Sequence, residues 1–122
     1  MIKNFFKNTG FHKRFWEERQ IDWKKSYLDT WQHPHRTLIS KLLSTFYWGS
    51  LFEVGCGSGA NLKNILMHFK NKQLGGLDVN ADAIELAQSV FQGAFFKVGS
   101  VEDIMMSDNS ADVVLSDMCL IY

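Results

Sequence analysis

The sequence predicts an α/β fold in which a mainly parallel sheet lies between layers of helices and follows a helical N-terminal segment. Two observations lead to this class. After residue 49, short apolar runs alternate with stretches of helical periodicity, and a glycine-rich turn directly follows the first apolar run. Such alternation is typical of βαβ units, whose right-handed crossovers are expected to place helices on both sides of a parallel sheet. The length of 122 residues corresponds to one domain.

Composition narrows the possible functions. The chain has 13 basic and 13 acidic residues, a formal net charge of zero, and 46% hydrophobic residues. This balance argues against a polybasic nucleic-acid arm, and the apolar content argues against disorder. We expect no signal peptide and no membrane span. Cys56 and Cys119 lie far apart without metal-ligand spacing, so we expect no metal site and a reducing, cytoplasmic environment.

Residues 1–33 are predicted to form an N-terminal amphipathic helical segment, and residues 34–122 the remaining part of the domain. The aromatic residues of the first part recur at spacings of seven, four and four, which places them on one face of a helix. They are Trp16, Trp23, Tyr27 and Trp31. This face either covers a core or forms a lid over a ligand. Pro34 suits the first turn of a second helix, whose apolar spacing continues to Tyr47, and Gly49 is the expected stop.

Four strands are predicted, with helices between them. They cover residues 50–54, 74–79, 94–98 and 111–116. The fourth is apolar enough to be buried on both faces of a sheet. We expect the topological switch between the first and fourth strands, where open α/β sheets bind their ligands.

The segment that indicates chemistry is Glu53–Gly59, with the sequence EVGCGSG. Its three glycines follow a strand and precede a helix, so the backbone can turn tightly and a ligand can approach it closely. Asp78 ends the next strand, where a carboxylate can accept both hydroxyls of a ribose. The alternative is a structural turn with a solvated Asp78. Gly55, Gly57 and Ala60 also satisfy the G-x-G-x-x-G/A pattern of dinucleotide sites.

Taken in order, these motifs resemble the class I S-adenosylmethionine-dependent methyltransferases. The matching segments are EVGCGSG at 53–59, LDVN at 77–80, VGSVEDI at 98–104 and DNSADVVLSD at 108–117. Glu53 and the helices before the first strand favour this family over NAD enzymes. The resemblance implies a three-layer Rossmann-like sandwich. That fold has seven strands, so we expect an apparently truncated domain that lacks the C-terminal strands.

The resemblance also implies a site for S-adenosylmethionine, with S-adenosylhomocysteine as product. Its cofactor-binding residues would be Glu53, Gly55, Cys56, Gly57, Gly59, Asp78, Val79, Ser100, Val101 and Ser116. Ser100 stands where the family usually has an acidic residue, and its hydroxyl would accept the adenine amino group without charge assistance. Asp117 is the candidate catalytic residue, beside the transferred methyl group. Tyr27, His35 and Arg36 are further candidates for contacts with the cofactor carboxylate.

The implied function is methyl transfer to an unidentified small molecule. The alternatives are a fragment of an NAD(P)-binding Rossmann oxidoreductase and a non-catalytic module that keeps the fold for interaction. Nucleic acids and membranes are not expected partners. A fourth strand with an unpaired apolar edge favours pairing with another chain, so we predict a possible homodimer through residues 111–117.

Overall fold

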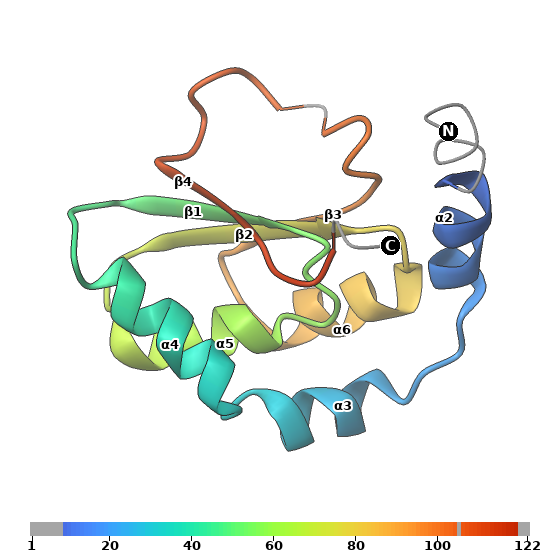
Figure 1. The fold of residues 1–122 in the computed structure, drawn as a ribbon, viewed down its shortest axis with the longest axis horizontal. Coiled ribbons are helices and arrows are strands. Elements are labelled where there is room, and N and C mark those ends of the chain that lie inside the picture. The colour runs from blue at the N-terminus through green and yellow to red at the C-terminus, as the bar shows by residue number, and fades with distance from the viewer. Residues whose placement is uncertain (1–8, 105, 120–122) are drawn as a thin grey trace, which may run out of the picture.

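The computed structural model describes residues 9–104 and 106–119, which contain one sheet of four parallel strands in the order β3-β2-β1-β4 (Figure 1). The strands are β1 (Ser50–Val54), β2 (Gln73–Asp78), β3 (Phe95–Val98) and β4 (Val113–Ser116). The α/β class and the switch point between β1 and β4 are therefore confirmed. Residues 1–8 of the predicted N-terminal segment and 120–122 of the second part lie outside the described residues. The boundary predicted at residue 33 stays a prediction.

The register of the sheet brings the carboxyl ends of the strands together. Val54, the last residue of β1, pairs with Leu77 of β2 on one side and with Ser116 of β4 on the other. Asp78 at the end of β2 pairs with Val98 of β3. The segments that follow all four strands consequently share one edge of the sheet, at which ligands of parallel sheets bind.

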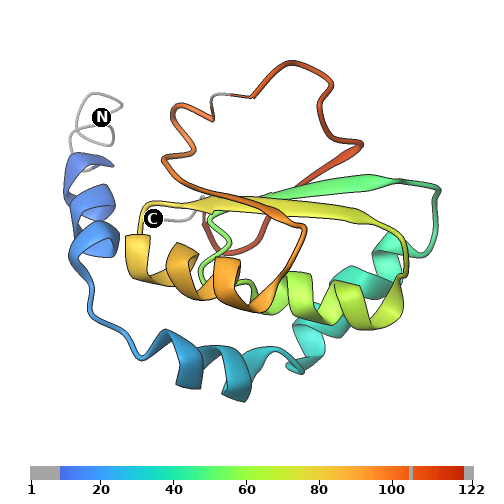
Figure 2. The same ribbon diagram turned by 180° about the vertical axis from the view of Figure 1, so that it is seen from behind.

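The helices of the described residues are α2 (Thr9–Glu18), α3 (Trp23–Thr30), α4 (Pro34–Leu43), α5 (Ala60–His68) and α6 (Ala81–Val90). α3, α4, α5 and α6 lie on one face of the sheet, whereas α2 stands beside the sheet (Figures 1 and 2). α4 packs on α5, and α3 contacts both α5 and α6. The two crossovers, through α5 and α6, run in the same direction from β1 to β3 and therefore cover the same face. On the other face, where helices were also predicted, the described residues 99–104 and 106–112 are irregular and form no helix.

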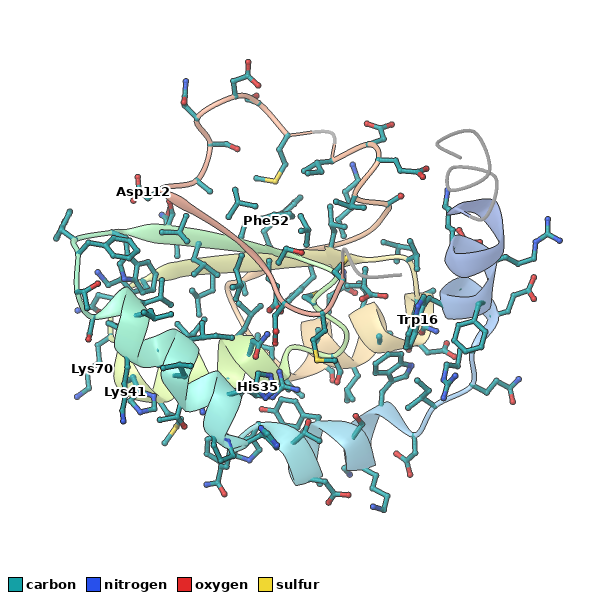
Figure 3. The ribbon with its side chains drawn as sticks, in the orientation of Figure 1. Trp16, His35, Lys41, Phe52, Lys70 and Asp112 are labelled. Atoms are coloured by element: carbon teal, nitrogen blue, oxygen red, sulfur yellow. The ribbon has the colours of Figure 1, made fainter. Side chains whose placement is uncertain are left out.

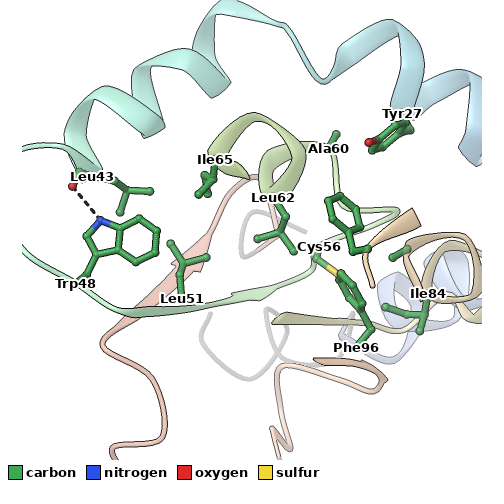
Figure 4. Close-up of a cluster of buried hydrophobic side chains, with 12 residues drawn as sticks. Tyr27, Leu43, Trp48, Leu51, Cys56, Ala60, Leu62, Ile65, Ile84 and Phe96 are labelled. Carbon is green, nitrogen blue, oxygen red and sulfur yellow. Dashed lines mark hydrogen bonds between the residues drawn. The ribbon is translucent and has the colours of Figure 1, made fainter. Parts of the chain in front are cut away.

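Each face of the sheet has its own apolar cluster. On the face opposite the helices, Phe52 points toward the segment 99–112 (Figure 3) and packs with Val54 and Leu77. The helix-side cluster is larger and includes Trp48, whose indole nitrogen donates to the carbonyl of Leu43 at 3.0 Å (Figure 4). The buried members of this cluster are Tyr27, Leu43, Trp48, Leu51, Cys56, Ala60, Leu62, Ile65, Ile84, Ala87, Phe91 and Phe96. These clusters fix the sheet and its helices beneath the glycine turn.

The predicted single N-terminal helix is wrong, because the structure has two helices with a break at residues 19–22. Asp22 caps α3, since its side chain accepts from the backbone nitrogen of Lys25 at 2.9 Å. Such a cap favours a new helix start over continuation. The break divides the aromatic stripe, because Tyr27 is buried in the core whereas Trp23 lies over the glycine turn.

The helix that starts at Pro34 also differs from its prediction, because it ends at Leu43, well before Gly49. The hydroxyls of Ser44 and Thr45 donate to carbonyls of its last turn, at 2.6 and 2.7 Å. Local hydroxyl-to-carbonyl bonds of this kind compete with helix propagation. The stripe of leucines misled the prediction, since Leu38 and Leu42 are exposed.

The fourth strand is not buried on both faces as predicted. Val113 and Leu115 pack against the helix-side cluster, whereas Val114 is 64% exposed on the opposite face. Asp112 holds the start of this strand, because its carboxylate accepts from the backbone nitrogens of Gly49 and Ser50 at 2.7 and 3.0 Å. The strand is thus well anchored at its amino end and half-covered along its length.

Candidate functional site

A cavity of about 460 Å³ opens at the carboxyl ends of β1, β2 and β4. Its walls come from the glycine turn, from the strand ends, and from α2, α3 and α4 of the N-terminal half. This volume falls in the range of ~300–1,000 Å³ that is common for small-molecule sites. The position is the one that the switch point predicts for a ligand.

The turn after β1 needs glycine for both conformation and space. Gly55, Gly57 and Gly59 all have positive φ, at 73°, 55° and 93°. A Cβ on Gly55 would collide with the side chain of Cys119, and one on Gly57 would lie 3.2 Å from the ring of Trp23. The turn is anchored because the nitrogens of Gly55 and Cys56 donate to the carbonyl of Leu77 at 2.8 and 2.9 Å.

Asp78 is fixed by backbone donors on both carboxylate oxygens. Oδ2 accepts from the nitrogen of Gly57 at 2.9 Å, and Oδ1 accepts from the nitrogen of Asn80 at 2.9 Å. Burial raises the pKa of this carboxyl, against the opposing effect of the backbone hydrogen bonds. Each oxygen keeps a further lone pair, so the carboxylate can still accept two hydroxyls.

Glu53 is the most deeply buried acid of the site, with 2% of its surface exposed. Its Oε1 accepts from Nδ2 of Asn61 at 2.7 Å, and its Oε2 has no partner within the described part of the chain. Burial raises the pKa of Glu53 to about 8, although the Asn61 bond and the charge of Arg36 oppose this shift. A buried carboxyl group with one oxygen left without a partner is energetically costly when no ligand bonds that oxygen.

Asp117, after β4, joins Glu53 in one polar network. The Nδ2 of Asn61 donates to Asp117 Oδ2 at 3.0 Å as well as to Glu53, so one amide bridges two carboxyls. His35 Nε2 lies 3.0 Å and Arg36 Nη1 4.0 Å from the same Asp117 oxygen. Burial lowers the pKa of Arg36, whose Nε donates to the carbonyl of Thr30 at 2.8 Å. The network links α4, α5, β1 and the end of β4.

The structure brings most of the predicted site residues together around the cavity. Those that line it are Glu53, Gly55, Cys56, Gly57, Asp78, Val79, Ser100, Val101 and Asp117. Gly59 is outside the wall at the start of α5, where a Cβ would meet the ring of Phe91, and Ser116 is exposed. His35 and Arg36 also line the cavity, whereas Tyr27 is in the core beside Phe91. The roles assigned to these residues stay predictions.

Asn61 and Cys119 line the cavity but were missed by the sequence predictions. Asn61 and the neighbouring Asn64 lie beside the apolar stripe of α5 at helical spacing, and such buried amides are the signal that would have indicated a polar network on that face. Trp16 and Trp23 both line the cavity, which favours the lid interpretation for their half of the aromatic stripe. Cys119 gave no usable signal, because its contact with Gly55 depends on the path of the chain after β4.

Within residues 9–104 and 106–119, no helix is long and apolar enough to cross a membrane. The His, Cys, Asp and Glu side chains of the same residues form no group of three that could hold a metal ion.

A parallel sheet, a positive-φ glycine turn and an acid at the end of the neighbouring strand are together typical of folds with a site for a nucleotide-type cofactor. A family model described as a methyltransferase domain matches residues 51–122, more than half of the chain. The chain belongs to this family, which confirms the resemblance derived from its motifs. The family uses S-adenosylmethionine as its methyl donor, so the family match confirms the predicted cofactor.

Solved structures share the fold. The plantazolicin methyltransferase BpumL, in complex with a desmethylPZN analog and SAH, is 24% identical with a TM-score of 0.62, covering 79% of this chain and 40% of that one. A putative S-adenosyl-L-methionine-dependent methyltransferase from Methanococcus maripaludis is 19% identical with a TM-score of 0.66, covering 86% and 55%. The YcgJ protein from Bacillus subtilis is 20% identical with a TM-score of 0.58, covering 69% and 38%.

The chain thus spans 38–55% of the length of these structures. No match to the sequences of curated proteins is significant.

Proposed function

We propose that this cavity binds S-adenosylmethionine and that the protein transfers its methyl group to a small-molecule acceptor. The observation that carries the proposal is Asp78, a carboxylate aimed by two backbone donors at the mouth of a glycine turn. Such a carboxylate suits the two hydroxyls of a ribose. Glu53, unpaired on one oxygen, suits the amino group at the other end of the cofactor. Val79, Ser100 and Val101 would surround the adenine.

The protein's own groups would act mainly by position. When bound, the sulfonium supplies an already activated methyl group. Asp117, held by Asn61 and His35, would orient the acceptor and take up its proton. The aromatic and aliphatic walls would exclude water and align the reacting atoms.

The acceptor, partners and location are part of the same proposal. The similar BpumL structure contains an analog of desmethylPZN, which supports a small-molecule or peptide-derived acceptor here. The neutral net charge favours such an acceptor over nucleic acid. Two free cysteines support a cytoplasmic location. The uncovered face of β4 supports self-association, with a homodimer as the expected form.

Calorimetric titration with S-adenosylhomocysteine tests the proposal. We expect a saturable site in the wild-type protein and, because charged hydrogen bonds to the ribose are lost, binding weaker by about 1–3 kcal/mol in Asp78→Ala. NAD is titrated in parallel, and tighter binding of NAD would favour the oxidoreductase alternative. Replacing the exposed Asp82 with alanine is the control, because this carboxylate lies on α6 outside the cavity wall. Equal affinity in Asp78→Ala and wild type would remove Asp78 from the site.

A further inference from the structure

One side of the cavity is closed by the roof segment, which we define as residues 13–23. Lys13 and Trp16 of α2 and Trp23 of α3 contribute to the cavity wall. The ring of Trp23 lies over Gly57, and its carbonyl accepts from the hydroxyl of Ser58 at 3.4 Å. The indole nitrogen of Trp23 is buried and has no hydrogen-bond partner within the described part of the chain. A buried donor without a partner costs free energy, so this nitrogen is available to bond a ligand in the cavity.

The side chain of Asn80 bonds the roof segment twice, from the loop after β2. Nδ2 of Asn80 donates to the carbonyls of Trp16 and Arg19, at 2.9 and 3.0 Å. Both carbonyls belong to the end of α2, where a helix lacks internal donors. Figure 3 shows Trp16 where α2 meets the start of α6. Asn80 therefore caps α2 from outside and ties it to the body of the protein.

Asn80 also contacts Asp78, the carboxylate proposed to bind the ribose, and the start of α6. Its backbone nitrogen donates to Asp78 Oδ1 at 2.9 Å, and its Oδ1 accepts from the nitrogen of Ala83 at 3.0 Å as the N-cap of α6. Asn80 is 2% exposed and does not itself line the cavity. One buried residue thus contacts Asp78 through its backbone nitrogen and the end of α2 through its side chain.

We propose that Asn80 is a latch that closes the roof segment over bound cofactor, with Trp16 and Trp23 as cofactor-contacting residues. This inference rests on the proposed cofactor site. Asn80 acts through the roof, so it is a positioning residue rather than a catalytic one. With the latch intact, the cofactor leaves only when the two carbonyl bonds break, and release is therefore slow.

The two functions of Asn80 can be separated by substitution. Asn80→Asp keeps an oxygen that caps α6 but has no donor for the carbonyls of Trp16 and Arg19. Asn80→Ser also keeps a capping oxygen and adds no charge beside Asp78. We expect both variants to release S-adenosylhomocysteine about tenfold faster than wild type, measured by stopped-flow tryptophan fluorescence. Hydrogen exchange should become faster in the roof segment and stay unchanged in α6.

Asn64→Asp is the matched control. Asn64 is also buried and also donates its amide to a carbonyl of the N-terminal half, that of Trp31 at 3.0 Å, but it lies outside the cavity wall. This variant loses a comparable donor, so we expect lower stability with an unchanged release rate. Trp23→Phe should remove most of the fluorescence change on binding, and Trp31→Phe should retain it.

Each outcome decides the proposal. Unchanged release in Asn80→Asp and Asn80→Ser would overturn the latch, as would faster exchange in α6 to the same extent as in the roof. Equal acceleration in Asn64→Asp would reduce the effect to general loss of stability and also overturn it. If the wild-type protein binds no S-adenosylhomocysteine, the proposed function fails instead. Exchange in the roof segment of the free protein would then still test the latch by itself.

Discussion

At the scale of single residues, the charge in the cavity wall depends on whether Glu53 carries a proton. With its pKa raised to about 8 by burial, it carries a proton at neutral pH in the free protein. That proton belongs on Oε2, because Oε1 accepts a hydrogen bond from Asn61. The neighbouring carboxylate of Asp117 shares the same amide donor, so neutral Glu53 avoids a pair of adjacent negative charges.

The raised pKa of Glu53 predicts how stability depends on pH. The folded protein holds a proton that the unfolded chain releases above its ordinary value of 4.5, so this contribution is complete below pH 4.5 and disappears as pH rises through 8. Glu53→Gln keeps the acceptor for Asn61 without titrating. Relative to this variant, the wild type should lose on the order of 3 kcal/mol of unfolding free energy between pH 5 and 8.5.

Urea denaturation of both proteins across this pH range measures the difference. Glu85→Gln, which changes an exposed acid on α6, should follow the wild type. Parallel curves for wild type and Glu53→Gln would show that Glu53 is ionised in the folded protein throughout the range.

At the scale of elements, the glycine turn is the part of the site that sequence predicts best. Its three glycines, the strand before it and the helix after it are all local signals, and β1 has the predicted bounds. Asp78 could be predicted from the sequence equally well, because it ends a strand at the expected spacing after the glycines. The polar network was not predictable from sequence, since Asn61 of α5 and His35 of α4 both reach Asp117 only in the folded protein.

The errors in predicting helices have a common physical origin. Periodicity shows which residues share a face but not where side-chain caps interrupt the helix. Asp22 caps the start of α3 and so divides the aromatic stripe between two helices. At the end of α4, the hydroxyls of Ser44 and Thr45 donate to carbonyls of the last turn. Hydrophobicity alone likewise overestimated the burial of Leu38, Leu42 and β4, because it cannot specify which apolar face finds a partner.

The turn itself gives a prediction about close approach. Gly55→Ala places a methyl group against Cys119 and forces a positive φ, so we expect a loss of about 2–4 kcal/mol of unfolding free energy and greatly weakened binding of S-adenosylhomocysteine. Gly93→Ala is the matched control. Gly93 has φ of 81° and no atom within 4 Å of an added Cβ, so this variant should lose only about 1 kcal/mol. Thermal unfolding and calorimetry separate the two effects.

If Gly55→Ala and Gly93→Ala are equally destabilised and Gly55→Ala binds normally, conformational strain accounts for the glycine, and its contact with Cys119 is irrelevant.

At the scale of the whole molecule, the two faces of the sheet are covered unequally. The helices cover one face along all the strands, while the segment 99–112 covers Phe52, Val54 and Leu77 in the middle of the other. β4 pairs with β1 along one edge, and among the described residues no strand pairs with its other edge. The cavity at the carboxyl ends of the strands is lined by described residues, whereas the outer edge of β4 has no neighbouring strand among them.

This asymmetry predicts self-association that is independent of cofactor binding. Strands with an unpaired edge and an exposed apolar side chain tend to pair with another chain, and a lysine on such a strand discourages pairing. We expect the wild-type chain to dimerise as its concentration rises in sedimentation velocity experiments, and Val114→Lys to remain monomeric. Because Val114 lies outside the cavity wall, both proteins should bind S-adenosylhomocysteine with the same affinity. A wild-type chain that stays monomeric at millimolar concentration would show that the half-covered face of β4 is tolerated in water, and that the exposed valine does not drive association.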